Sequence, residues 1–120
     1  MKQAYFIFLL IISFQGFSQS VKVKEIGLEV MTEDLGDMDW RDAKNACRNL
    51  GNGWRLPTKD ELNKMYAHRN SIGGLNQYEY WSSEQSAIDA NAWYFDTLWG
   101  RAYNTNKNRY LYVRAVRNLK

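Results

Sequence analysis

Cysteine, histidine and proline each occur only once in the 120-residue chain, as Cys47, His68 and Pro57. A single cysteine excludes a disulfide within the chain. One cysteine and one histidine cannot fill the four positions of a tetrahedral zinc site. A Cys–His nucleophile would need a reactive thiolate, but Cys47 falls on the apolar stripe of an expected helix, where cysteine packs as a small hydrophobe. We therefore expect no enzyme activity, no cofactor and no metal site.

Long hydrophobic runs are also scarce, and the one that stands out is at the N-terminus, at positions 4–12. It is too short to span a bilayer, which takes about 20 residues. Gly16 and Ser18 fit the small-residue positions of a signal-peptide cleavage site. We expect residues 1–18 to be a signal peptide, residues 19–120 to form one exported domain, and no anchor to remain after cleavage. Retention of the segment as an N-terminal anchor is the alternative.

Net charge is small, at +3 from 16 basic and 13 acidic residues. This balance is too weak to indicate a nucleic-acid partner. The charge is unevenly distributed, because acids gather at positions 25–42 and no acidic residue follows Asp96. The basic C-terminal part favours an anionic partner or pairing with the chain's own acidic segment, and both remain open.

Two helices have clear start signals. Asp39 is expected to cap a helix over 40–50. Its core-facing apolar residues recur at three- to four-residue spacing and are Trp40, Ala43, Cys47 and Leu50. Thr58 and Glu61 form a capping box, a reciprocal pair of side chain to backbone hydrogen bonds, for a second helix over 59–68. These helices are the firmest structural expectations from the sequence.

Most of the remaining chain is typical of strands. They are predicted at 26–31, 80–83, 92–96, 101–104 and 110–117, with a glycine-containing loop at 70–77 and turns at 98–100 and 104–108. A strand, two helices and then a run of strands is an α+β order. We predict two helices packed on short, twisted antiparallel strands.

Arg114 and Arg117 in the last predicted strand are expected to hold carboxylates inside the fold. Glu61 is a candidate partner for them.

The acidic loop at 32–38, together with the cap that follows it, is dense in carboxylates, namely Glu33, Asp34, Asp37 and Asp39. Weak calcium binding needs several such oxygens to converge. We favour the simpler interpretation, a solvated loop followed by a helix cap.

A candidate binding segment lies between Trp99 and Arg109. Trp99 precedes Gly100 at an expected turn, where an indole is difficult to bury. The candidate ligand-binding residues are Trp99, Arg101, Tyr103, Asn106, Lys107 and Arg109. Sugar sites combine an aromatic plane, amide groups and arginine forks in this way. A polar hairpin whose tryptophan covers the edge of the core is the alternative.

Four motifs, "GWRLPTKDEL", "YWSSEQ", "AWYFD" and "YVRAVRN", occur in an order that resembles the Lcl C-terminal domain family. That family takes its name from a bacterial collagen-like adhesin. It is similar in turn to the wider C-type-lectin-like group, which includes formylglycine-generating-enzyme-like domains. The resemblance covers roughly positions 26–118. It implies a C-type-lectin-like α+β fold and surface binding rather than catalysis, with sulfated glycans and trimer formation linked to the adhesin. The collagen repeat is missing here.

Together these features predict an exported, non-catalytic binding domain that recognises an anionic or sulfated glycan. We expect it to be secreted, periplasmic or on the cell surface. The alternative is a protein–protein interaction module of the cell envelope, which would use the same aromatic-rich surface.

Overall fold

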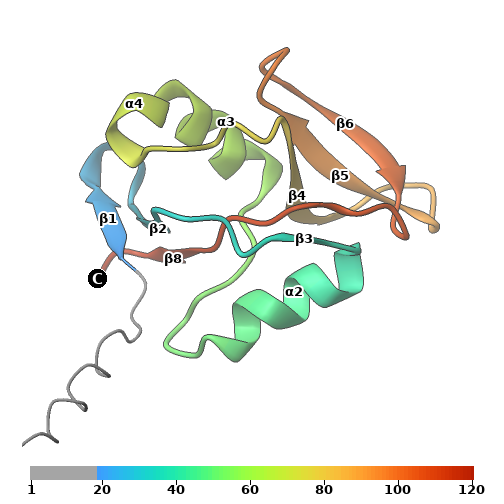
Figure 1. Ribbon diagram of the computed structural model, residues 1–120, viewed down its shortest axis with the longest axis horizontal. Helices are drawn as coiled ribbons and strands as arrows, with labels where there is room; N and C mark the ends of the chain where they lie inside the picture. The colour runs from blue at the N-terminus through green and yellow to red at the C-terminus, as the bar shows by residue number, and fades with distance from the viewer. Residues whose placement is uncertain (1–18) are drawn as a thin grey trace, which may run out of the picture.

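Two β-sheets form the centre of the molecule, with helices on both sides of them (Figure 1). The computed structural model describes residues 19–120. The first sheet has the order β1 (Ser20–Val23), β2 (Leu28–Met31) and β8 (Val116–Asn118). The second has the order β3 (Asp37–Met38), β7 (Leu111–Tyr112), β4 (Glu79–Gln85), β5 (Asn91–Asp96) and β6 (Arg101–Asn106). The predicted α+β class is confirmed.

All neighbouring strands pair antiparallel except β4 and β7, which are parallel at Tyr80 and Tyr112. The predicted antiparallel pairing is thus confirmed at every pair of strands but this one. Since β6 is antiparallel to β5, and β5 to β4, strand β6 points the same way as β4. Strand β7 therefore continues in the direction of β6 instead of folding back beside it.

The two predicted helices are confirmed, as α2 (Trp40–Asn49) and α3 (Lys59–Ala67). The Asp39 carboxylate accepts a hydrogen bond from the Asp42 amide at 2.9 Å and so caps α2. At α3 the capping box is complete, because the Thr58 hydroxyl accepts from the Glu61 amide and the Glu61 carboxylate accepts from the Thr58 amide.

The loop expected at 70–77 begins with a short helix, α4 (Arg69–Ile72). Ile72 is buried, and its contact with the core holds this extra turn of helix in place. A four-residue helix has too few repeats for a hydrophobic period to reveal it.

Two hydrophobic clusters fill the space between sheets and helices. One lies beneath α3 and α4 and consists of Val23, Leu28, Val30, Leu62, Met65, Ile72, Leu75, Tyr80, Phe95 and Val116. The other lies beneath α2 and consists of Met31, Trp40, Ala43, Cys47, Leu56, Trp81, Ala92, Leu111, Val113 and Ala115. Neighbouring residues of β4, Tyr80 and Trp81, enter different clusters, as expected where both faces of a strand are covered.

The first predicted strand, 26–31, is in fact the second half of a hairpin. Strand β1 precedes it, and the chain turns through a single 3-10 turn (Lys24–Ile26) before β2. Gly27 ends this turn with φ +70°, a left-handed conformation that glycine adopts without steric cost. The glycine therefore marks a turn between two strands.

The last predicted strand, 110–117, is divided between the two sheets as β7 and β8. Arg114 lies in the break and is only 1% exposed. Its guanidinium pairs with Asp34 at 2.8 Å and donates to the carbonyl oxygens of Met31 and Gly73. Positions 113–116 are all buried, so the chain does not alternate between a buried and an exposed face here, and the inward-facing arginine is held by long-range partners.

The structural role predicted for Arg114 and Arg117 is confirmed, since Arg117 pairs with Glu29 at 2.9 Å. The partner is wrong, because Glu61 pairs with Arg55. Both arginines thus neutralise acids near the start of the domain. For these two residues, the basic C-terminal part pairs with the chain's own acidic segment, which was one of the two interpretations of the charge distribution.

The predicted signal peptide, 1–18, lies outside the described residues. Among residues 19–120, no helix is both long and apolar enough to cross a membrane.

Candidate anion-binding site

The six predicted site residues are distributed along the β5–β6 hairpin and do not meet in one place. Trp99 lies in the turn between the strands and is 70% exposed. Lys107 follows the opposite end of β6. A six-residue strand is roughly 17 Å long, so one sugar ring cannot contact both. Arg101 is exposed beside the turn.

Tyr103 and Arg109 lie between these ends and are engaged by neighbours within the fold. The Tyr103 ring centroid is 6.0 Å from that of Tyr94. The Arg109 guanidinium pairs with Glu79 at 2.8 Å and lies 5.9 Å from the centroid of the Tyr94 ring. Arg109 therefore stabilises the hairpin and is already neutralised.

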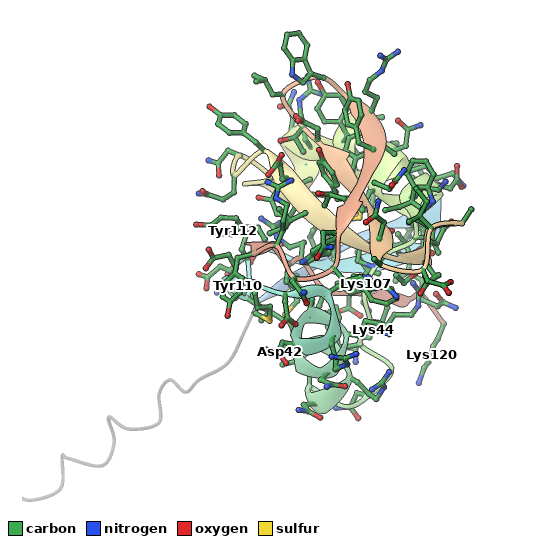
Figure 2. All side chains as sticks on the ribbon, turned by 90° about the vertical axis from the view of Figure 1, so that its right-hand side faces the viewer. Asp42, Lys44, Lys107, Tyr110, Tyr112 and Lys120 are labelled. Atoms are coloured by element: carbon green, nitrogen blue, oxygen red, sulfur yellow. The ribbon has the colours of Figure 1, made fainter. Side chains whose placement is uncertain are left out.

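Asn106 and Lys107 line a pocket of about 190 Å³, in which they meet residues from α2. We call it the Trp40 pocket; its lining residues are Asp39, Trp40, Arg41, Lys44, Ala90, Asn106, Lys107 and Asn108. Figure 2 shows Lys107 and Lys44 close together on the same side of the molecule, at the junction of α2 and the second sheet.

Trp40 forms the floor of this pocket and joins the two elements. Its indole N–H donates to the Ser82 carbonyl at 2.8 Å, and its backbone amide donates to the Lys107 carbonyl at 3.0 Å. The side chain is 7% exposed. The start of α2 is therefore fixed against the turn after β6.

Two ammonium groups lie over the Trp40 ring. Lys44 Nζ is 3.8 Å and Lys107 Nζ is 4.9 Å from the ring centroid. The negative face of an indole attracts cations, and Lys107 also donates to the Gln85 amide oxygen at 2.6 Å. Both charges are thus held in fixed positions.

The pocket has a surplus of positive charge. The pKa of Lys44 is lowered, first by its partial burial and then by repulsion from Arg48, Lys107 and Arg41. Within residues 19–120, neither Lys44 nor Lys107 forms an ion pair. The pocket also contains the Asp39 carboxylate, which caps α2. A bound anion would relieve the repulsion between the cations.

A second pocket, of about 370 Å³, shares Lys44 with the first. Its other lining residues are Arg48, Trp54, Arg55, Leu56, Thr58 and Ser83. The stretch "GWRLPT", which fixes the start of α3, therefore also forms one wall of a hollow beside the Trp40 pocket.

Sequence reasoning found Asn106 and Lys107 but missed Trp40, Arg41 and Lys44. A local signal existed, since Trp40 and Lys44 are four residues apart and so share one face of α2. The sequence did not show that α2 contacts the turn after β6, because Trp40 and Lys107 are 67 residues apart in the chain.

The acidic loop shows no metal cluster. Asp34 is paired with Arg114 and Asp39 caps α2. Among residues 19–120, no three metal-ligating side chains come together as a possible metal site.

Cys47 is fully buried, as predicted, and burial raises the pKa of its thiol to about 12. The thiol is therefore protonated at neutral pH and cannot act as the thiolate nucleophile that a Cys–His pair would require.

A model of the Lcl C-terminal domain family matches residues 19–117. No curated protein matches the chain significantly. The family match spans every strand and helix described above except the end of β8.

Proposed function

The chain belongs to the Lcl C-terminal domain family, and we propose that it binds sulfate or carboxylate groups of an anionic glycan in the Trp40 pocket. The family is one of adhesin-type C-terminal domains, which is compatible with a non-catalytic binding role at the cell surface or outside the cell. The glycan, the site and the C-type-lectin-like relationship go beyond that membership.

One observation carries the proposal: two ammonium groups without carboxylate partners in the described chain share one tryptophan ring. Because Trp40 is buried, the ring positions the cations and does not itself offer a stacking plane. Charge-assisted hydrogen bonds from fixed ammonium groups are among the stronger polar contacts. The site is thus arranged to recognise charge.

Two further features favour a sugar carrying the anion. Asn106 and Asn108 line the same pocket, and side-chain amides can donate to and accept from hydroxyl groups. The second pocket adjoins the first at Lys44, so a glycan longer than one sugar has space to continue.

The test compares dextran sulfate with uncharged dextran, two polymers with the same backbone. We expect the protein to bind dextran sulfate alone. Raising salt from 0.1 to 1 M should weaken binding steeply, because the Debye length falls from about 10 Å to about 3 Å. Lys44→Gln and Lys107→Gln should each weaken binding about 10-fold, the effect of losing one hydrogen bond to a charged group.

Two variants serve as controls. Lys64→Gln removes an exposed lysine on α3 that pairs only with Asp60 on the same helix, and Trp99→Ala alters the far end of the hairpin. Both should bind dextran sulfate as the unmodified protein does. Equal losses with Lys64→Gln would mean that net charge alone causes binding. Failure to bind either polymer would overturn the glycan proposal and favour an envelope protein as the partner.

A further inference from the structure

The turn between β5 and β6 projects past α3 and α4 at the top of Figure 1. It presents two adjacent apolar side chains, Leu98 and Trp99, which are 59% and 70% exposed. Tyr78, 54% exposed, lies beside them, because its carbonyl accepts from the Thr97 amide at 2.6 Å. We call Tyr78, Leu98 and Trp99 the hairpin tip.

The turn is rigidly built. The Asp96 carboxylate accepts from the amides of Leu98 and Trp99 at 2.8 and 3.2 Å. Gly100 then takes φ +69° and donates to the Asp96 carbonyl at 2.7 Å. A flexible turn could fold its indole back onto the protein, but this one holds Leu98 and Trp99 outward.

Tyr78 adds a second sign of function. Its φ is +75°, a conformation that costs a bulky residue roughly 1–3 kcal/mol and that clusters at functional sites. The strained backbone keeps an aromatic ring exposed at the same end of the sheet as the turn.

Positive charge borders the hairpin tip. Arg101 follows Gly100 and is exposed. Gly100 packs against the Tyr66 ring, since a side-chain carbon at Gly100 would lie 3.1 Å from it. The Arg69 guanidinium lies 4.2 Å from the centroid of the same ring, so Arg69 is close to the turn as well. The carboxylate of Asp96, in contrast, is turned inward to cap the turn.

We propose that the hairpin tip docks on the surface of a lipid bilayer containing anionic lipids, with Leu98 and Trp99 entering the interface and Arg69 and Arg101 contacting lipid phosphates. Tryptophan has an apolar body and a polar N–H and is enriched at membrane interfaces. Arginine pairs well with phosphate.

The charge around the hairpin tip favours an anionic bilayer as its partner. Within residues 19–120, neither Arg69 nor Arg101 forms an ion pair. Neither charge is therefore neutralised by the described part of the chain, and both guanidinium groups can pair with lipid phosphates. A bilayer needs no matching pocket, since a few inserted side chains with nearby cations suffice for reversible attachment.

The test is co-sedimentation with vesicles, using residues 19–120, the predicted mature domain, once its cooperative unfolding has been verified. We expect binding to vesicles of equal parts phosphatidylglycerol and phosphatidylcholine, and much less to phosphatidylcholine alone. Trp99→Ala and Leu98→Ser should each reduce sedimentation at least five-fold. Arg101→Gln should reduce it only on the anionic vesicles.

Matched controls come from the opposite end of the sheet and from α2. Tyr110 and Ile88 are 66% and 59% exposed, so Tyr110→Ala and Ile88→Ser remove similar apolar surface elsewhere. They should sediment as the unmodified protein does, and so should Arg48→Gln and Lys44→Gln. Retained binding by Lys44→Gln separates this surface from the glycan site.

Three results would overturn the proposal. One is no binding to either vesicle, and another is an equal loss in the Tyr110→Ala and Ile88→Ser controls. The third is a different occupant: Trp99-dependent dimerisation in light scattering would assign the hairpin tip to a second copy, and Trp99-dependent binding to uncharged dextran would assign it to a sugar.

Discussion

The two ends of the β5–β6 hairpin use the same residue types in opposite ways. At one end, the Trp40 indole is buried and carries two lysine ammonium groups above it. At the other end, the Trp99 indole is exposed, and Arg101, which is also exposed, follows two residues later. A tryptophan near basic residues therefore does not predict one kind of binding site. The burial of the indole decides whether the site offers charge or apolar surface.

The two ends also differ in what supports them. The Trp40 pocket is formed where α2 packs on the second cluster, so it depends on tertiary contacts. The hairpin tip depends on hydrogen bonds between Asp96 and Gly100, which are close in sequence. Changes at the pocket should therefore affect the whole domain, whereas changes at the tip should remain local.

Thiol labelling should show the largest difference. Cys47 lies on the buried face of α2 with no exposed surface, and burial raises the pKa of its thiol to about 12. We expect it to resist a thiol reagent in the native protein and to react after denaturation. Leu98→Cys, at the exposed tip, should label at once. Mass spectrometry would count the labels, and rapid native labelling of Cys47 would contradict a closed core beneath the pocket.

The two tryptophans should differ strongly in their effect on stability. Trp40→Ala should lower the free energy of unfolding by about 3–5 kcal/mol, as expected for removing a large buried aromatic. Trp99→Ala should change it by no more than about 0.5 kcal/mol, as for most surface substitutions. Urea unfolding would measure both. A large loss with Trp99→Ala would show that this indole covers the edge of the core, the alternative considered from the sequence.

The features predicted from sequence are those with local causes. The caps of α2 and α3 are set within four residues, and both were predicted correctly. The turn at Trp99 was also predicted from a local feature, the glycine that follows it, and the tryptophan is exposed there as expected. The break at Arg114 could not be predicted, because its partners Asp34 and Gly73 lie 80 and 41 residues away. The sequence predicted that Arg114 would hold a carboxylate inside the fold, but it did not show which carboxylate or that the strand would break at this residue.

The candidate site was only half predictable for the same reason. Asn106 and Lys107 stood out by composition within one segment. Their partners Trp40 and Lys44 come from a helix more than 60 residues earlier in the chain. Trp40 was correctly expected in the core, and for that reason it was not considered as part of a binding site. Sequence order also suggested that Trp99 and Lys107 act together, whereas the extended strand between them keeps them apart.

Two aspartates offer a smaller, more local comparison. Asp96→Ala removes the charged acceptor for two amides at the tip and should cost about 1.5–3 kcal/mol, the range for hydrogen bonds to a charged group. Asp39→Ala removes the cap of α2 and should cost about 1 kcal/mol. Hydrogen exchange distinguishes them, since only Asp96→Ala should speed exchange at the Leu98 and Trp99 amides.

If Asp96→Ala left those exchange rates unchanged, the outward position of the tip would not depend on the carboxylate. Vesicle binding provides the functional counterpart. Asp96→Ala should weaken it, because a loosened turn must be ordered again on docking, and Asp39→Ala should not.

The smallest effect expected is on the stability of Lys44→Met, which keeps the apolar stem over Trp40 and removes the charge. The pKa of Lys44 is lowered in the fold, chiefly by burial and then by its basic neighbours, so the unfolded chain binds this proton more tightly. The charge therefore opposes folding at neutral pH, and its penalty disappears as the pH rises through the ordinary lysine pKa of 10.5.

At pH 7, Lys44→Met should be at least as stable as the unmodified protein, with a gain in the free energy of unfolding of no more than about 0.5 kcal/mol. The difference should disappear above pH 10.5. Urea unfolding at both pH values would measure it, with Lys64→Met as the control without such neighbours. A clear loss of stability in Lys44→Met at pH 7 would mean that the charge is held for the fold, and the pocket would then lose its strongest distinction from an ordinary packed surface.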